Sequence, residues 1–150
     1  MAYYKDLTPY EYFADHEPLK PMPQNIGWLS IWVPFAKGET SQEFKDRLLE
    51  FCSDAFVVHI ARGFHECEFC NLKDWYSTQN NIYGEQAHWA SIGDGEIRVP
   101  GKRTVYAAPA LVYHYVVEHG YRPPDEFLEA VLEGPPPGSQ EHLDLLRKYR

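Results

Sequence analysis

Two cysteines and a group of histidines carry the strongest chemical signal in the sequence. Cys67 and Cys70 are separated by two residues, a spacing at which a tight turn lets two thiolates bind one metal ion. His114 and His119 follow in an apolar segment, separated by four residues, as in zinc-binding histidine pairs. We therefore predict a metal site formed by Cys67, Cys70 and His114 together with one further histidine.

The sequence leaves two choices for the fourth ligand. Positions five apart on a regular helix point about 140° away from each other, so His119 can join His114 only if the helix loosens at its C-terminal end. Gly120 permits such an ending. His65 competes with His119 because it lies beside the cysteines themselves.

Mixed sulfur and nitrogen ligands favour Zn2+. The alternative is a pair of thiols without a metal, with His119 capping a helix end.

Several catalytic uses of these residues are disfavoured. Glu66 and Glu68 flank Cys67, and their negative charge opposes the thiolate that a redox-active dithiol needs. The cysteine pair lacks the preceding proline of the zinc deaminases, and the chain contains no His-Glu-x-x-His. A site with four protein ligands is closed, which predicts a structural Zn2+ ion and a non-catalytic protein.

Composition bounds the kind of molecule that carries this site. With 150 residues, 44% hydrophobic and 24% charged, the chain is predicted to be a single globular domain, with residues 1–24 as an N-terminal arm and 134–150 as a proline-separated C-terminal helix. Its net charge of −8 disfavours nucleic acid and anionic membranes and allows a basic protein partner. Without a signal-like N-terminus, an apolar run of about 18 residues or an even cysteine framework, a cytoplasmic protein is expected.

Hydrophobic patterning predicts an α+β fold with a small antiparallel sheet or hairpins and helices mostly on one side. The helices expected from capping residues and apolar spacing are 42–53, 109–119, 127–132 and 139–148. The strands expected from β-branched and aromatic residues are 26–33 and 55–61, and a hairpin is expected from 96–99 and 104–107 around a four-residue turn. Trp28 and Trp32 share one face of the first of these strands and are predicted to be buried.

Glu96 and Arg98 alternate on the expected hairpin, so their side chains share one face. One interpretation places them as a polar, ligand-binding pair near the metal; the other treats them as a structural ion pair or a solvated face. An enzymatic alternative follows from the first: with three protein ligands and a water on zinc, a hydrolase would use Glu96 as general base and Arg98 as anion binder. The favoured hypothesis is a protein-interaction module of immunity or regulatory type, which rests on size and charge.

Five motifs follow one another from Tyr3 to about Val131: YYKDLTPYEY, RGFHECEFC, GEIRVPG, YAAPALVYHYV with His119, and YRPPDEFLEAV. Through these motifs the chain resembles a family of small bacterial proteins classed as a domain of unknown function. The resemblance implies no activity. It places eight residues on motif positions: His65, Cys67, Cys70, Glu96, Arg98, Tyr106, His114 and His119.

Overall fold

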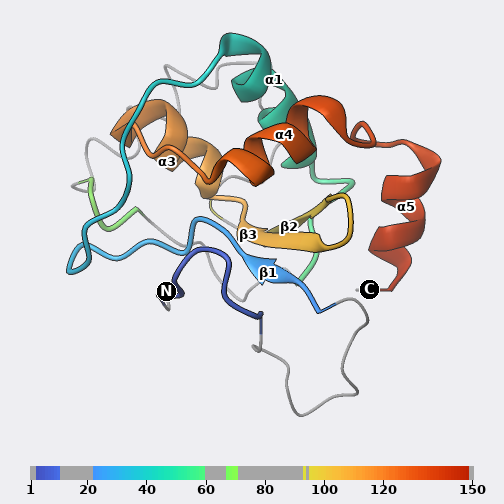
Figure 1. Cartoon of the computed structure of the whole chain (residues 1–150), viewed down its shortest axis with the longest axis horizontal. Coiled ribbons are helices and arrows are strands. Elements are labelled where there is room, and N and C mark those ends of the chain that lie inside the picture. Colours follow the sequence, from blue (N-terminus) through green and yellow to red (C-terminus); the bar gives the residue numbers. More distant parts are fainter. Residues whose placement is uncertain (1–2, 11–21, 60–66, 71–92, 94, 149–150) are drawn as a thin grey trace.

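A small mixed sheet lies at the centre of the fold, and helices cover one of its faces (Figure 1). In this computed structural model the described residues are 3–10, 22–59, 67–70, 93 and 95–148. The strands run in the order β1-β3-β2, with β1 (Gln24–Asn25) parallel to β3 (Val105–Pro109) and β2 (Glu96–Pro100) antiparallel to it. The α+β prediction is confirmed, although β1 makes the sheet mixed.

Local sequence signals explain the helices. Helix α1 (Gln42–Phe51) begins where Ser41 Oγ accepts a hydrogen bond from the Phe44 N–H at 3.1 Å, and it buries Phe44, Leu48 and Phe51 on one face. Helices α3 (Val112–His119) and α4 (Asp125–Glu133) pack on α1. Helix α5 (Gln140–Arg147), capped by Ser139, lies beside β2. Within the described residues, no helix is long and apolar enough to cross a membrane.

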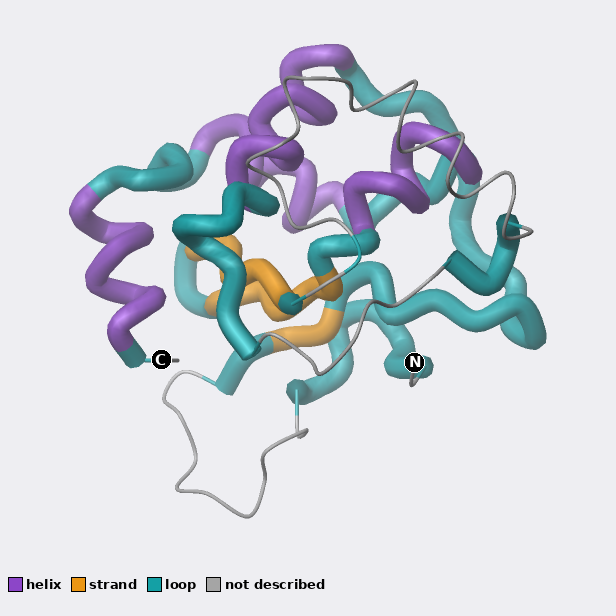
Figure 2. The backbone as a smooth tube through the Cα atoms, turned by 180° about the vertical axis from the view of Figure 1, so that it is seen from behind, coloured by secondary structure: helices purple, strands orange, loops and turns teal. Residues whose placement is uncertain are grey.

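The hairpin separates two environments, one on each face of the sheet. Register pairs Val99 with Tyr106 and Ile97 with Ala108, and these four side chains belong to the main core together with the helices. The opposite face carries Arg98 paired with Ala107. On that face Tyr10 and Trp28 pack against Ala107, so residues from the N-terminal segment cover it. Figure 2 shows the strands from behind, in the middle of the molecule.

Two predicted strands and one predicted helix start are wrong in the part of the chain that the structure describes. Residues 26–33 do not form a strand: the chain turns at Gly27, whose φ of 74° belongs to the left-handed region, and Trp32 is 85% exposed. In the stretch predicted as strand 55–61, Val58 makes only an isolated bridge to Glu96, and residues 60–61 lie outside the described part. Pro109 ends β3 and does not begin the next helix, which starts at Val112.

Candidate metal centre

The cysteines lie at the two ends of one tight turn. The Cys70 N–H donates to the Cys67 carbonyl at 3.3 Å, which brings both side chains to the same side. Backbone N–H groups of Phe69 and Cys70 also point at the Cys67 sulfur, and such donors favour a thiolate. Without a cation beside it, burial dominates and raises the pKa of the Cys67 thiol to about 12. A metal ion bound here would supply the positive charge that favours the thiolate form of this buried sulfur.

The histidines come from α3, one from its middle and one from its end. His114 is fully buried, and His119 is the last helical residue. The last turn is wider than an α-helical turn, because the N–H groups of Gly120 and Tyr121 both donate to the Tyr115 carbonyl, whereas a regular helix would bond Gly120 to Val116. Gly120 closes the helix with φ 66° and ψ 20°. This ending turns His119 toward His114.

A separate segment fixes the end of α3 from outside. The Gly38 N–H donates to the Gly120 carbonyl at 3.0 Å, and the Arg122 N–H donates to the Ala36 carbonyl at 2.9 Å. Lys37 and Tyr121 form the antiparallel bridge between these bonds. The wide turn that orients His119 is therefore part of a hydrogen-bonded ladder and not a frayed terminus.

The four side chains converge on one point, with all donor atoms within 4.8 Å of one another. Cys67 Sγ lies 3.3 Å from His119 Nε2, and Cys70 Sγ lies 3.4 Å from His114 Nε2 and 3.3 Å from His119 Nε2. The two Nε2 atoms are 3.3 Å apart. A tetrahedral zinc ion spaces sulfur and nitrogen ligands about 3.6 Å apart and two nitrogens about 3.3 Å apart, given its usual bond lengths. The group could therefore hold a metal ion.

Both imidazoles are suited to act as neutral ligands. Burial, with a smaller contribution from His119, lowers the pKa of His114 to about 4. Burial also lowers the pKa of His119, with Lys37 acting in the same direction. A histidine whose pKa is depressed is neutral near pH 7, so its Nε2 lone pair is available without the loss of a proton.

Phe69 attaches the cysteine turn to the helix. Its ring packs against His119 with centroids 5.3 Å apart, edge-on against Tyr115 at 5.7 Å and edge-on against Phe35 at 5.3 Å. Phe35 in turn packs on Tyr121 at 6.0 Å. Aromatic contacts on three sides hold the turn in position independently of any ion. Sequence reasoning did not identify Phe69 or Phe35. Phe69 could have been found from its position as an aromatic residue between the two cysteines.

Glu96 and Arg98 are placed across the sheet from the Cys/His group. Arg98 is fully buried, and its Nη2 lies 3.0 Å from Glu96 Oε1. The Tyr10 hydroxyl donates to the same Glu96 oxygen at 2.7 Å, and the Arg98 guanidinium stacks over the Tyr10 ring at 4.7 Å. Cys67 belongs to the core on the opposite face, with Ile97. The pair therefore matches the structural ion-pair interpretation, and the role of Tyr10 was not predicted.

His65, the other predicted fourth ligand, lies outside the described residues. No curated protein and no solved structure matches the chain. A family model does match, over residues 2–132. This segment contains all four converging side chains and, among the described strands and helices, all but α5 and the last residue of α4. The chain belongs to this family, which is described as a domain of unknown function (DUF7919).

Proposed function

We propose that Cys67, Cys70, His114 and His119 bind one Zn2+ ion that stabilises the fold, and that the protein acts by binding another molecule and not by catalysis. The observation that carries the proposal is the convergence of two sulfur and two nitrogen donors at tetrahedral spacing. Two thiolates with two imidazoles are a common ligand set of structural zinc sites. A redox metal or a hard cation would favour a different set.

The closed ligand set supports a non-catalytic role. A catalytic zinc ion keeps one position for water or substrate, whereas here a fourth protein donor lies within reach. Glu96, the base that a hydrolase would need, is bonded to Tyr10 and Arg98 on the other face of the sheet. The chain carries 22 acidic against 14 basic residues, so the binding partner that we propose is a basic protein.

Metal analysis of the untagged full-length protein tests the zinc assignment. We expect about one zinc per chain by mass spectrometry, and a chelator should lower the melting temperature by many degrees. Cys67→Ser should lose the metal. Cys52→Ser is the matched control, because Cys52 is a buried cysteine whose thiol faces the Ala110 carbonyl instead. Absence of zinc, or equal zinc in both variants, would refute the assignment.

A second measurement separates a closed site from an open one. Co2+ substituted for zinc reports its coordination through visible absorption. We expect a tetrahedral spectrum that azide or cyanide does not change, because no ligand position is free. A spectral change on adding these anions would show an exchangeable ligand and would support the hydrolase alternative instead.

A further inference from the structure

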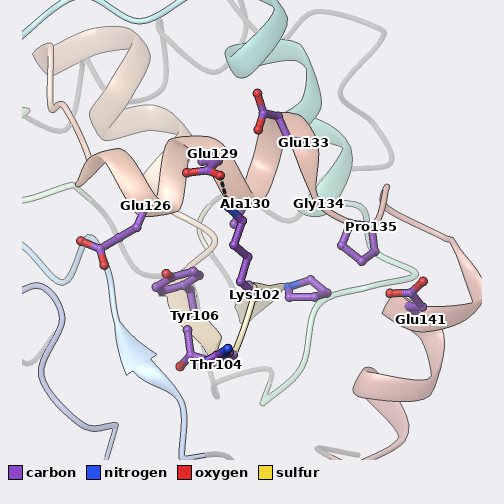
Figure 3. A pocket seen from close by; sticks show the side chains of 13 residues that line it. Lys102, Thr104, Tyr106, Glu126, Glu129, Ala130, Glu133, Gly134, Pro135 and Glu141 are labelled. Carbon is purple, nitrogen blue, oxygen red and sulfur yellow. Dashed lines mark ion pairs between the residues drawn. The ribbon is translucent and has the colours of Figure 1, made fainter.

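A pocket of about 600 Å³ lies between the β2–β3 turn and the helices α4 and α5 (Figure 3). The turn contributes Lys102 and Arg103, β3 contributes Tyr106, and glutamates line the helical side. This volume falls within the range of small-ligand sites. The pocket lies apart from the metal centre, with which it shares no residue.

The pocket carries more negative than positive charge. Glu126, Glu129 and Glu133 follow one another at helical spacing along α4, and Glu141 faces them from α5. Against these four carboxylates stand Lys102 and Arg103. Within the described part of the chain, the ion pair between Lys102 Nζ and Glu129 Oε1, at 2.8 Å, is the only one among the lining residues. Negative charge therefore remains for a ligand.

Tyr106 forms a buried polar wall of this pocket. Its side chain is 4% exposed, and none of the hydrogen bonds made by the described residues involves its hydroxyl. The ring is fixed edge-on against Phe127 at 5.7 Å, and a Cβ at Gly101 would lie only 2.8 Å from it. Burial, reinforced by Glu126 and Glu129, raises the pKa of Tyr106, so the hydroxyl is neutral. Among the described residues the fully buried polar atoms without a partner do not include this hydroxyl, so it is open to the pocket, where a ligand or water can bond to it.

Lys102 shows which chemical group the pocket accepts. Figure 3 shows its side chain extending from the turn to Glu129, beside the Tyr106 ring. The Lys102 side chain is 87% exposed, so its ion pair with Glu129 is only loosely held. The C-terminal end of α4 adds the negative pole of a helix dipole at Gly134. Carboxylates, an aromatic ring with a free hydroxyl and a helix C-terminus all favour a cation with several N–H donors.

We propose that this pocket binds an organic cation, an ammonium or guanidinium group, and that Lys102 is a tethered competitor for the same carboxylates. The cation is carried either by a basic side chain of a partner or by a free amine. The proposal rests on the binding role proposed above but not on the zinc, because the pocket and the metal centre are separate. Its failure would therefore leave the zinc assignment standing.

Nuclear magnetic resonance titration of the full chain, as purified, tests the proposal with three probes. The first is an acetylated and amidated glycine–arginine–glycine tripeptide, the second is spermidine, and the third is the tripeptide with neutral citrulline in place of arginine. We expect saturable amide shifts at Tyr106 and Gly134 with the two cations only. Tighter binding of the tripeptide assigns the cation to a protein side chain, and tighter binding of spermidine assigns it to a free amine.

Variants separate this pocket from the general acidity of the surface. Lys102→Gln should tighten binding about threefold, and Glu126→Gln should weaken it about threefold, which is the scale of one exposed ion pair. Tyr106→Phe should also weaken it, since it removes only the hydroxyl. The matched control is Lys45→Gln on α1, which changes the net charge equally and lies outside the pocket. Equal effects of both lysine variants, unchanged binding in Glu126→Gln, or equal binding of citrulline would overturn the proposal.

Discussion

His114 and His119 bring their Nε2 atoms within 3.3 Å of each other although both belong to one helix and are not on the same face of a regular turn. The wide final turn, in which Tyr115 accepts both the Gly120 and the Tyr121 N–H, makes this approach possible. The backbone geometry at the end of α3 therefore brings together the two imidazoles of the candidate metal centre.

Gly120 should be sensitive to substitution because of its backbone and not because of crowding. Its φ is 66°, and a Cβ there would meet nothing within 4 Å. We expect Gly120→Ala to lower the unfolding free energy by about 1 kcal/mol, or the melting temperature by about 2–4 °C for a chain of this size. Gly120→Asn should cost less, since asparagine tolerates this region. Calorimetry of the metal-loaded variants measures both; equal stability of the alanine variant and the wild type would contradict the argument.

Phe69→Ala should weaken metal binding without removing a ligand. The ring holds the cysteine turn against Tyr115 and His119, and residues that orient ligands typically change metal affinity by about tenfold or more. Competition with a chromophoric chelator measures this affinity. Phe56→Ala is the matched control, because Phe56 packs on His142 of α5, away from the metal centre. We expect it to reduce stability and leave zinc affinity unchanged, so equal losses of affinity in the two variants would count against the role of Phe69.

The buried Glu96–Arg98 pair should matter for stability and not for the metal. Arg98→Met leaves the Glu96 carboxylate on a buried face without its cation, which we expect to cost about 3 kcal/mol in chemical denaturation. Adding Glu96→Gln should recover part of this loss, because the unpaired charge is then removed. Zinc content should stay that of the wild type in both variants. Loss of zinc from a folded Arg98→Met protein would show that the pair supports the metal centre after all.

Local signals made much of the fold predictable. Ser41 caps α1 as expected, whereas Ser139, predicted as the first residue of its helix, is the N-cap of α5. The hairpin connection has four residues as predicted, but it lies at 101–104 and not at 100–103. These elements depend on residues close by in the sequence, so their positions can be predicted from local sequence patterns. The strand predicted over 26–33 does not form because Gly27, with its left-handed backbone, turns the chain there. The two tryptophans after this glycine lie in different environments. Trp28 donates to the Ala107 carbonyl in the core, whereas Trp32 is exposed.

For the metal centre, residue types and spacing were enough to nominate the set but not to choose within it. The structure brings His119 into the group through hydrogen bonds that depend on Ala36 and Gly38, far away in sequence. Long-range contacts of this kind leave no local pattern. The same holds for His142, which carried no signal in the sequence. It proves buried, with Phe51 and Phe56 edge-on against its ring and the Gly138 N–H donating to its Nδ1.

Metal binding at this centre would act as a cross-link. Cys70 and His119 are 49 positions apart, and the chain between them includes the whole β2–β3 hairpin. Joining the two ends of such a loop removes conformational freedom from the unfolded chain worth roughly 4 kcal/mol by the relation used for disulfides. An ion held by two thiolates and two imidazoles would thus restrict the unfolded chain as a disulfide does, with the difference that a chelator can remove the restriction.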